Sequence, residues 1–145
     1  MQKLRFETEL EAPKEKVWDV LWEDSTYREW TSVFSEGSHA VSDWKEGSKV
    51  LFLSGSGDGM YSRIAKRIPG EFMSFQHIGE ISEGKVQPMT DESKEWSGAM
   101  ENYSLSETNG KTTIEVEIDM MEDHVDYFRK TFPIALEKVK EIAER

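Results

Sequence analysis

The sequence contains no cysteine among its 145 residues and only four prolines. The missing thiols exclude disulfide bonds, thiolate nucleophiles and zinc sites with sulfur ligands, and they are compatible with a reducing compartment. The first residues, Met1–Phe6, also lack the apolar core of a secretory signal. We therefore expect a cytoplasmic protein.

Long hydrophobic runs and basic stripes are also missing. The apolar runs are short, as in Val50–Leu53, so none is long enough to span a bilayer. The chain has 18 basic and 29 acidic residues, a net charge of -11, and no run of Lys or Arg that could follow a phosphate backbone. We expect no nucleic-acid partner and no membrane insertion, and we interpret the acidic excess mainly as a soluble surface.

Motifs for metals and cofactors are absent as well. The three histidines, His39, His77 and His124, fall in unrelated segments without the spacing of a helical metal site. The glycine-rich segment 55–59 lies between two predicted strands, which indicates a hairpin turn, whereas a phosphate loop leads from a strand into a helix. We expect neither a metal nor a cofactor.

The last stretch of the chain, residues 123–143, has the apolar periodicity of an amphipathic helix. Asp123 is the expected N-cap, and Pro133 predicts either a kink or a short first segment before the main helix. The aromatic half and the aliphatic half of the stripe are expected to face different surroundings. The stripe consists of Val125, Phe128, Phe132, Ala135, Leu136, Val139, Ile142 and Ala143.

The preceding sequence predicts mainly strands. Residues 3–11 alternate as a half-buried strand, and two short helices follow, one over 15–22 and one carrying Tyr27 and Trp30. Turn signals then separate six strands at about 38–43, 48–54, 60–68, 71–80, 97–107 and 111–120. Residues 81–96 are interpreted as a solvated loop or as a lid over a cavity entrance. This order predicts one α+β domain over residues 1–145, with a seven-stranded antiparallel sheet covered by the C-terminal helix.

Two of these strands carry polar residues on their inward phase. If Phe75 faces inward, the period of two places His77 inward too, and if Tyr103 faces inward, Glu101 joins it. A central pairing of the two strands brings His77 and Glu101 close together. The buried carboxylate either accepts from a backbone group or a tyrosine hydroxyl at a bulge, or serves as a polar anchor for a ligand.

Aromatic and methionine side chains are the other candidates for a binding site. Each alone is better explained by a place in the core, but as a set they suit an adaptable pocket for flat or flexible apolar molecules. The predicted ligand-binding residues are Trp22, Trp30, Phe34, Met60, Phe75, His77, Met100, Glu101, Tyr103, Phe128 and Phe132.

The element order, together with four local sequences, resembles the helix-grip proteins of the START-like (SRPBCC) superfamily. The local sequences are Ala12-Pro13-x-x-x-Val17-Trp18, Trp30-Thr31, Asp43-Trp44-x-x-Gly47-Ser48 and Glu101-Asn102-Tyr103. Within the superfamily, the chain is most similar to the single-domain branch related to the C-terminal domain of the activator of heat-shock-protein-90 ATPase. The resemblance implies a sheet curled around a long C-terminal helix, with an elongated apolar cavity between them that holds lipids, sterols, polyketides or plant aromatics.

We accordingly expect a small-molecule binding protein rather than an enzyme, with a lipid, sterol, polyketide or flavonoid-like ligand. His77, Glu101 and Tyr103 would supply its directional polar contacts. One alternative is an enzyme similar to polyketide cyclases and dehydratases, in which His77 and Glu101 form an acid/base pair. A second alternative is a co-chaperone-like activator of a heat-shock-protein-90 ATPase, which would use the acidic surface to contact its chaperone partner.

Overall fold

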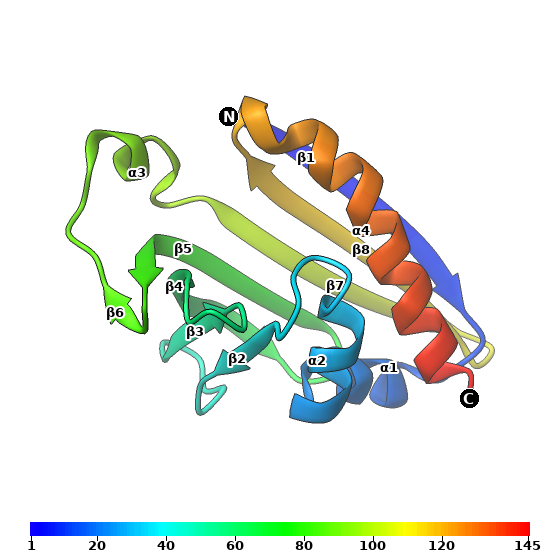
Figure 1. The fold of residues 1–145 in the computed structure, drawn as a ribbon. Coiled ribbons are helices and arrows are strands. Elements are labelled where there is room, and N and C mark those ends of the chain that lie inside the picture. The colour runs from blue at the N-terminus through cyan, green and yellow to red at the C-terminus, as the bar shows by residue number, and fades with distance from the viewer.

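The computed structural model describes the whole chain, Met1–Arg145, and Figure 1 shows its helices and strands. The strands are β1 (Gln2–Leu10), β2 (His39–Val41), β3 (Lys49–Leu53), β4 (Gly59–Ile68), β5 (Phe72–Ser82), β6 (Lys85–Val86), β7 (Met100–Thr108) and β8 (Lys111–Met120). The helices are α1 (Lys14–Trp22), α2 (Asp24–Thr31), α3 (Asp91–Trp96) and α4 (Glu122–Ala143).

The strands form one antiparallel sheet in the order β1-β8-β7-β5-β4-β3-β2, with β6 paired to β5 outside this path. The predicted α+β class and antiparallel sheet are confirmed, and β6 adds an eighth strand to the seven expected. This strand has only two residues, both exposed, and pairs with Ile81 and Ser82. A strand of that length has no alternation of side chains from which it could be predicted.

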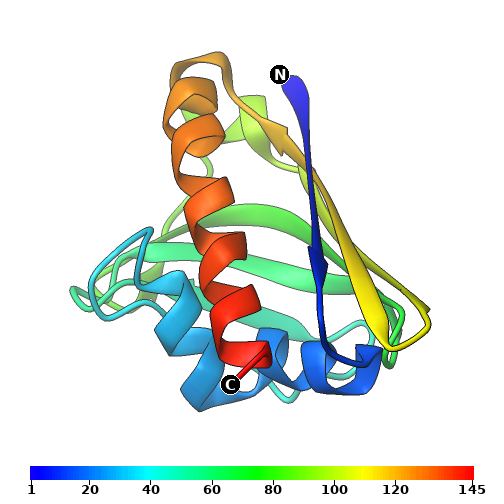
Figure 2. The same ribbon diagram turned by 90° about the vertical axis from the view of Figure 1, so that its right-hand side faces the viewer.

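Helix α4 lies across one face of the sheet, as the two views in Figures 1 and 2 show. Its predicted stripe is buried, apart from Phe128, which is half-buried. The expected cap is wrong, because Met121 is the N-cap residue and no side chain caps the helix. The helix also continues without interruption through Pro133, which excludes a short first segment. Pro133 and Arg129 are exposed, so water can reach the carbonyl that the missing N–H leaves free.

The two halves of α4 have different surroundings. The second half packs against α1, α2 and β1 and carries the fully buried Ala135 and Val139. At the junction of the halves, the Phe132 ring stacks on Phe6 with 4.9 Å between centroids. The first half buries Val125 in the core but turns His124 and Phe128 toward a cavity. The predicted difference between the aromatic and aliphatic halves is therefore confirmed.

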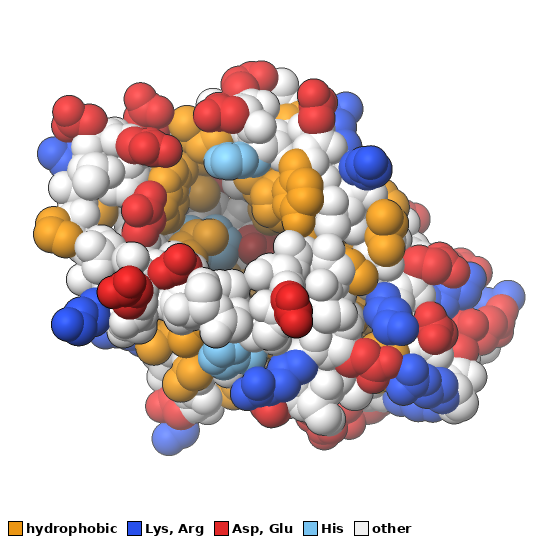
Figure 3. Space-filling view, in the orientation of Figure 1, with side chains coloured by type: hydrophobic (Ala, Val, Ile, Leu, Met, Phe, Trp, Pro, Cys, Tyr) orange, Lys and Arg blue, Asp and Glu red, His pale blue; other side chains and the backbone are white.

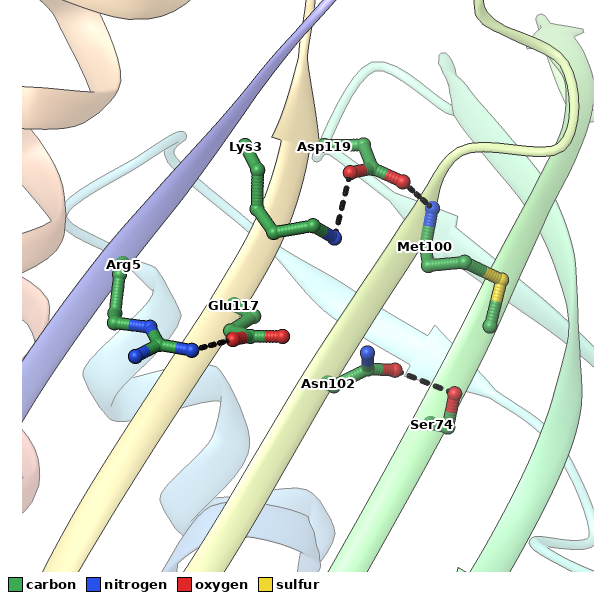
Figure 4. Close-up of polar contacts among 7 residues, drawn as sticks. All are labelled: Lys3, Arg5, Ser74, Met100, Asn102, Glu117 and Asp119. Carbon is green, nitrogen blue, oxygen red and sulfur yellow. Dashed lines mark hydrogen bonds and ion pairs between the residues drawn. The ribbon is translucent and has the colours of Figure 1, made fainter.

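Polar pairs between neighbouring strands cover the opposite face of the sheet (Figure 4). The Lys3 ammonium lies 3.0 Å from an Asp119 carboxylate oxygen, and Arg5 pairs with Glu117. Ser74 donates a hydrogen bond of 2.5 Å to the side-chain oxygen of Asn102. Because side chains alternate along a strand, this placement of Asn102 on the outer face turns its two neighbours, Glu101 and Tyr103, toward α4.

The connection between β5 and β7 is more structured than a plain solvated loop. It contains β6 and the short helix α3. The Thr90 hydroxyl accepts from the Ser93 backbone N–H while the Ser93 side chain accepts from the Thr90 N–H, so a complete capping box starts α3. None of the four helices is both long and apolar enough to cross a membrane.

Candidate functional site

A cavity of about 460 Å³ lies between the sheet and the helices α2, α3 and α4. Figure 3 shows the hollow from outside, with hydrophobic side chains around its rim and a histidine and an acidic side chain deeper inside. Fourteen of its 20 lining residues are hydrophobic. The lining consists of Tyr27, Trp30, Thr31, Phe34, Ser38, Phe52, Met60, His77, Trp96, Ala99, Glu101, Tyr103, Ile118, Asp119, Met120, Met121, His124, Tyr127, Phe128 and Phe132.

A chain of four polar side chains crosses the sheet at the inner wall of this cavity. The Ser62 hydroxyl lies 2.7 Å from His77 Nδ1, and His77 Nε2 lies 3.0 Å from Glu101 Oε1. The Tyr103 hydroxyl donates to Glu101 Oε2 at 2.5 Å. Glu101 therefore accepts a hydrogen bond from a tyrosine hydroxyl, as one of the two sequence interpretations predicted. It also faces a cavity, as the other interpretation predicted.

Strand register brings these four residues together. In the β5–β7 ladder Phe75 pairs with Glu101, and beyond it the His77 N–H donates to the Ala99 carbonyl. In the β4–β5 ladder Ser62 lies opposite His77, next to a register shift. The predicted proximity of His77 and Glu101 is confirmed, because both strands keep the phase that their apolar neighbours indicate.

The hydrogen bonds among these four side chains also indicate where their protons lie. An ionised carboxylate only accepts, so His77 Nε2 carries the proton that it shares with Glu101. Ser62 is fully buried, and His77 Nδ1 is the only acceptor within reach of its hydroxyl hydrogen. Protonation of Nδ1 would leave that buried donor unpaired, at a cost of about 1–3 kcal/mol. The geometry thus suits an imidazole whose Nε2–H donates to the Glu101 carboxylate and whose Nδ1 accepts from Ser62.

Two tyrosines complete the electrostatics of the inner wall. Burial, and then the negative charge of Glu101, raise the pKa of both Tyr27 and Tyr103 above the ordinary range. Both phenols stay protonated and can donate. Tyr103 already donates to Glu101, whereas the Tyr27 hydroxyl lines the cavity and has no partner within the protein.

Eight of the eleven side chains predicted to bind a ligand line the cavity, and their role in binding stays a prediction. They are Trp30, Phe34, Met60, His77, Glu101, Tyr103, Phe128 and Phe132. Trp22 and Phe75 are buried instead in an aromatic layer, with their ring centroids 5.3 Å apart. Met100 cannot share the inner face with both Glu101 and Tyr103, because alternation turns it to the outer face, as Figure 4 shows.

Several residues that line the cavity or support its polar wall were missed by sequence reasoning. Tyr27 was placed on a helix facing the core, and the strand residue Phe52 carried no signal beyond its apolar character. Trp96 comes from the connection between β5 and β7, whose place in the fold no periodicity reveals. Ser62 has the same phase as Met60 on β4, so period two could have identified it as an inward polar residue.

The site holds no group of three or more His, Asp or Glu side chains arranged to bind a metal ion. Of its two carboxylates, Asp119 sits at the margin, where burial opposes its ionisation. The Met100 backbone N–H and the Lys3 ammonium outweigh that effect and lower the pKa of Asp119.

Comparison with solved structures identifies the fold. The Aha1 dimer from Colwellia psychrerythraea, solved in solution, superposes with a TM-score of 0.76 at 18% identity, over 99% of this chain and 97% of that one. CalU16 from Micromonospora echinospora gives 0.69 at 16% identity, over 99% of this chain and 76% of CalU16. DynU16, from the dynemicin biosynthetic locus, gives 0.71 at 13% identity, and this chain spans 46% of it.

No protein-family profile matches the sequence, and no curated protein does either. At identities below 20%, similarity to these solved structures shows the fold and not the activity. The superpositions extend over at least 97% of this chain, so the sheet, the two short helices after β1 and the long helix α4 all lie within the shared fold. The protein therefore has the helix-grip fold, which it shares with these solved structures.

Proposed function

We propose that the protein binds a small apolar or aromatic molecule in the cavity between the sheet and α4. The observation that supports this most strongly is a cavity of about 460 Å³ whose wall is mainly apolar and carries one connected group of polar side chains. Ligand sites are typically cavities of roughly 300–1,000 Å³ with few, well-placed polar groups. A lipid, sterol, polyketide or flavonoid-like aromatic is the proposed ligand class.

Glu101 and Tyr27 are proposed to orient the ligand. Both nitrogens of His77 are already engaged, so the imidazole supports Glu101 rather than contacting the ligand. Glu101 keeps free lone pairs on its carboxylate oxygens, and the Tyr27 hydroxyl is free to donate. The aromatic rings on α2 and α4 would enclose the apolar body.

A thermal-shift screen against fatty acids, sterols, flavonoids and polyketides tests this proposal. A true ligand raises the melting temperature progressively with its concentration, because it binds only the folded state. The matched variant is Ala99→Phe, which places a ring in the cavity from a buried wall position. It should keep its melting temperature and lose the response. An equal response of the variant and the wild type would place the binding outside the cavity.

The hydrogen-bonded chain from Ser62 to Tyr103 supports a second candidate, an acid/base enzyme acting on a bound polyketide-like substrate. Such a reaction requires His77 to exchange its bond with Glu101 for one with the substrate. Mass analysis of a stabilising compound recovered after incubation decides between the two. Unchanged compound indicates a carrier or sensor, whereas conversion that His77→Ala abolishes indicates an enzyme.

The likeness to an Aha1 dimer supports one further candidate, an interaction with a chaperone through the acidic surface. The measurement is the ATPase rate of a heat-shock-protein-90 chaperone with and without this protein. Stimulation that survives Ala99→Phe would assign the activity to the surface instead of the cavity.

A further inference from the structure

The wall of the cavity contains no positively charged side chain. Its 20 lining residues include two carboxylates, Glu101 and Asp119, two histidines, and neither Lys nor Arg. A fatty acid or any other anionic ligand would therefore meet negative charge without a cation to balance it. The charge of the wall narrows the choice of ligand.

Only one of the two carboxylates has an unbalanced charge. Asp119 is paired with Lys3 at 3.0 Å. Glu101 has no Lys or Arg within ion-pair distance, and its side chain is only 19% exposed. Its single potential counter-ion is His77, whose Nδ1 is already engaged with the fully buried Ser62 hydroxyl. Glu101 is thus a largely buried anion supported by hydrogen bonds alone.

Several aromatic rings line the same cavity as this carboxylate. The Tyr27 and Trp30 centroids are 5.5 Å apart, Trp30 and Tyr103 are 6.5 Å apart, and Phe52 lies 5.9 Å from the His77 ring. The faces of such rings attract cations, most strongly where water is excluded. Burial, and then the charge of Glu101, raise the pKa of Tyr27 in the same cavity.

From this arrangement we infer that the ligand is an organic cation, a protonated amine on an apolar or aromatic body, whose N–H donates to the Glu101 carboxylate. The inference rests on the proposed binding function and narrows the bound apolar or aromatic molecule to one that carries a positive charge. The ammonium supplies the missing counter-charge, the rings of Tyr27 and Trp30 add cation–π attraction, and the apolar wall holds the body. The net charge of -11 also favours the approach of a cation to the protein.

Three compounds with one carbon skeleton test the inference: 3,3-diphenylpropylamine, 3,3-diphenylpropan-1-ol and 3,3-diphenylpropanoic acid. At pH 7.5 they present an ammonium, a hydroxyl and a carboxylate to the same cavity. Calorimetric titration at low salt should show the amine binding at least about ten-fold more tightly than the alcohol, with the acid weakest. Glu101→Gln should bring the amine to within about three-fold of the alcohol.

Glu117→Gln is the matched control. It removes the same charge from the outer face of β8, where Glu117 pairs with Arg5, and should leave the preference for the amine intact. Circular dichroism and thermal melting of Glu101→Gln establish that it is folded before its affinities are compared.

Two results would overturn the inference while leaving the proposed function standing. One is equal binding of the amine and the alcohol, and the other is an amine preference that Glu101→Gln does not change. Tightest binding by the acid would overturn it too, since that would require a positive His77. If none of the three compounds binds, the inference fails, and the proposed function is then judged by the wider ligand screen alone.

Discussion

The hydrogen bond from Tyr103 to Glu101 gives the most quantitative prediction. Tyr103→Phe removes one hydroxyl from a ring that is 2% exposed and deletes a 2.5 Å bond to the carboxylate. A hydrogen bond to a charged group contributes about 1.5–3 kcal/mol. The carboxylate keeps its bond from His77, and cavity water can replace part of the loss, so we expect a destabilisation of about 1–2 kcal/mol. For a domain of this size the melting temperature should fall by roughly 2–8 °C.

A double-mutant cycle with Glu101→Gln isolates the contribution of the charge. When Glu101→Gln is already present the acceptor is neutral, so the same Tyr103→Phe change should cost only about 0.5 kcal/mol and the coupling should be about 1 kcal/mol. The free energies of unfolding come from urea denaturation, with the m-value unchanged across the four proteins. Tyr127→Phe is the control, because its hydroxyl donates to the neutral Phe34 carbonyl at an exposed position.

Two outcomes would refute the reasoning. Strict additivity of the two changes would mean that the phenol and an ionised carboxylate are not bonded in solution. A stabilising effect of Tyr103→Phe would mean that the buried hydroxyl costs more in desolvation than its bond to the carboxylate returns.

Three further predictions follow from the same structure. Because burial and the charge of Glu101 raise the pKa of Tyr27 and Tyr103, the folded protein keeps protons that the unfolded chain loses above pH 10. The contribution of the two tyrosines to the free energy of unfolding should thus be fully present below pH 10 and fall above it, by up to about 1.4 kcal/mol per pH unit for each tyrosine. Urea denaturation between pH 9 and 11 should show a shallower fall after either Tyr→Phe change. Leu136→Ala, at a position 2% exposed on α4, should cost about 2–5 kcal/mol, whereas Ile134→Ala, 54% exposed on the same helix, should stay within about 0.5 kcal/mol; equal losses would contradict the packing described. Trp96→Ala, which removes a wall residue contributed by α3, should raise the dissociation rate of a bound ligand in stopped-flow displacement, and an unchanged rate would exclude α3 as a lid.

Much of the fold could be predicted from the sequence because strong periodicity determined it. The alternation in β8 and the 3.6-residue stripe of α4 both reflect burial on one face, which the structure confirms at Ile114, Val116 and Leu136. The N-cap of α4 could not be predicted, because Asp123 and Met121 differ by only two positions and tertiary packing decides where a helix begins. The strand β6 and the helix α3 lie in a segment without periodicity.

The candidate site was predictable in part for the same reason. The phase of β5 and β7 placed His77 beside Glu101, and period two applied consistently would also have removed Met100 from the predicted lining. The distinction between Phe132, which lines the cavity, and Phe75, which is buried behind it, requires the three-dimensional packing. In a sequence, an inward residue that fills a core looks the same as one that borders a cavity.

Native mass spectrometry of the purified protein tests the central claim most directly. The account predicts a non-covalent adduct of one small molecule per chain, retained under gentle ionisation, lost on denaturation and absent from Ala99→Phe. A compound that gives concentration-dependent stabilisation should restore the adduct to protein that has been stripped of its ligand. Bare protein both before and after addition of every compound class in the screen, and of the three diphenyl compounds, would contradict the account, and the cavity would then have no role in binding.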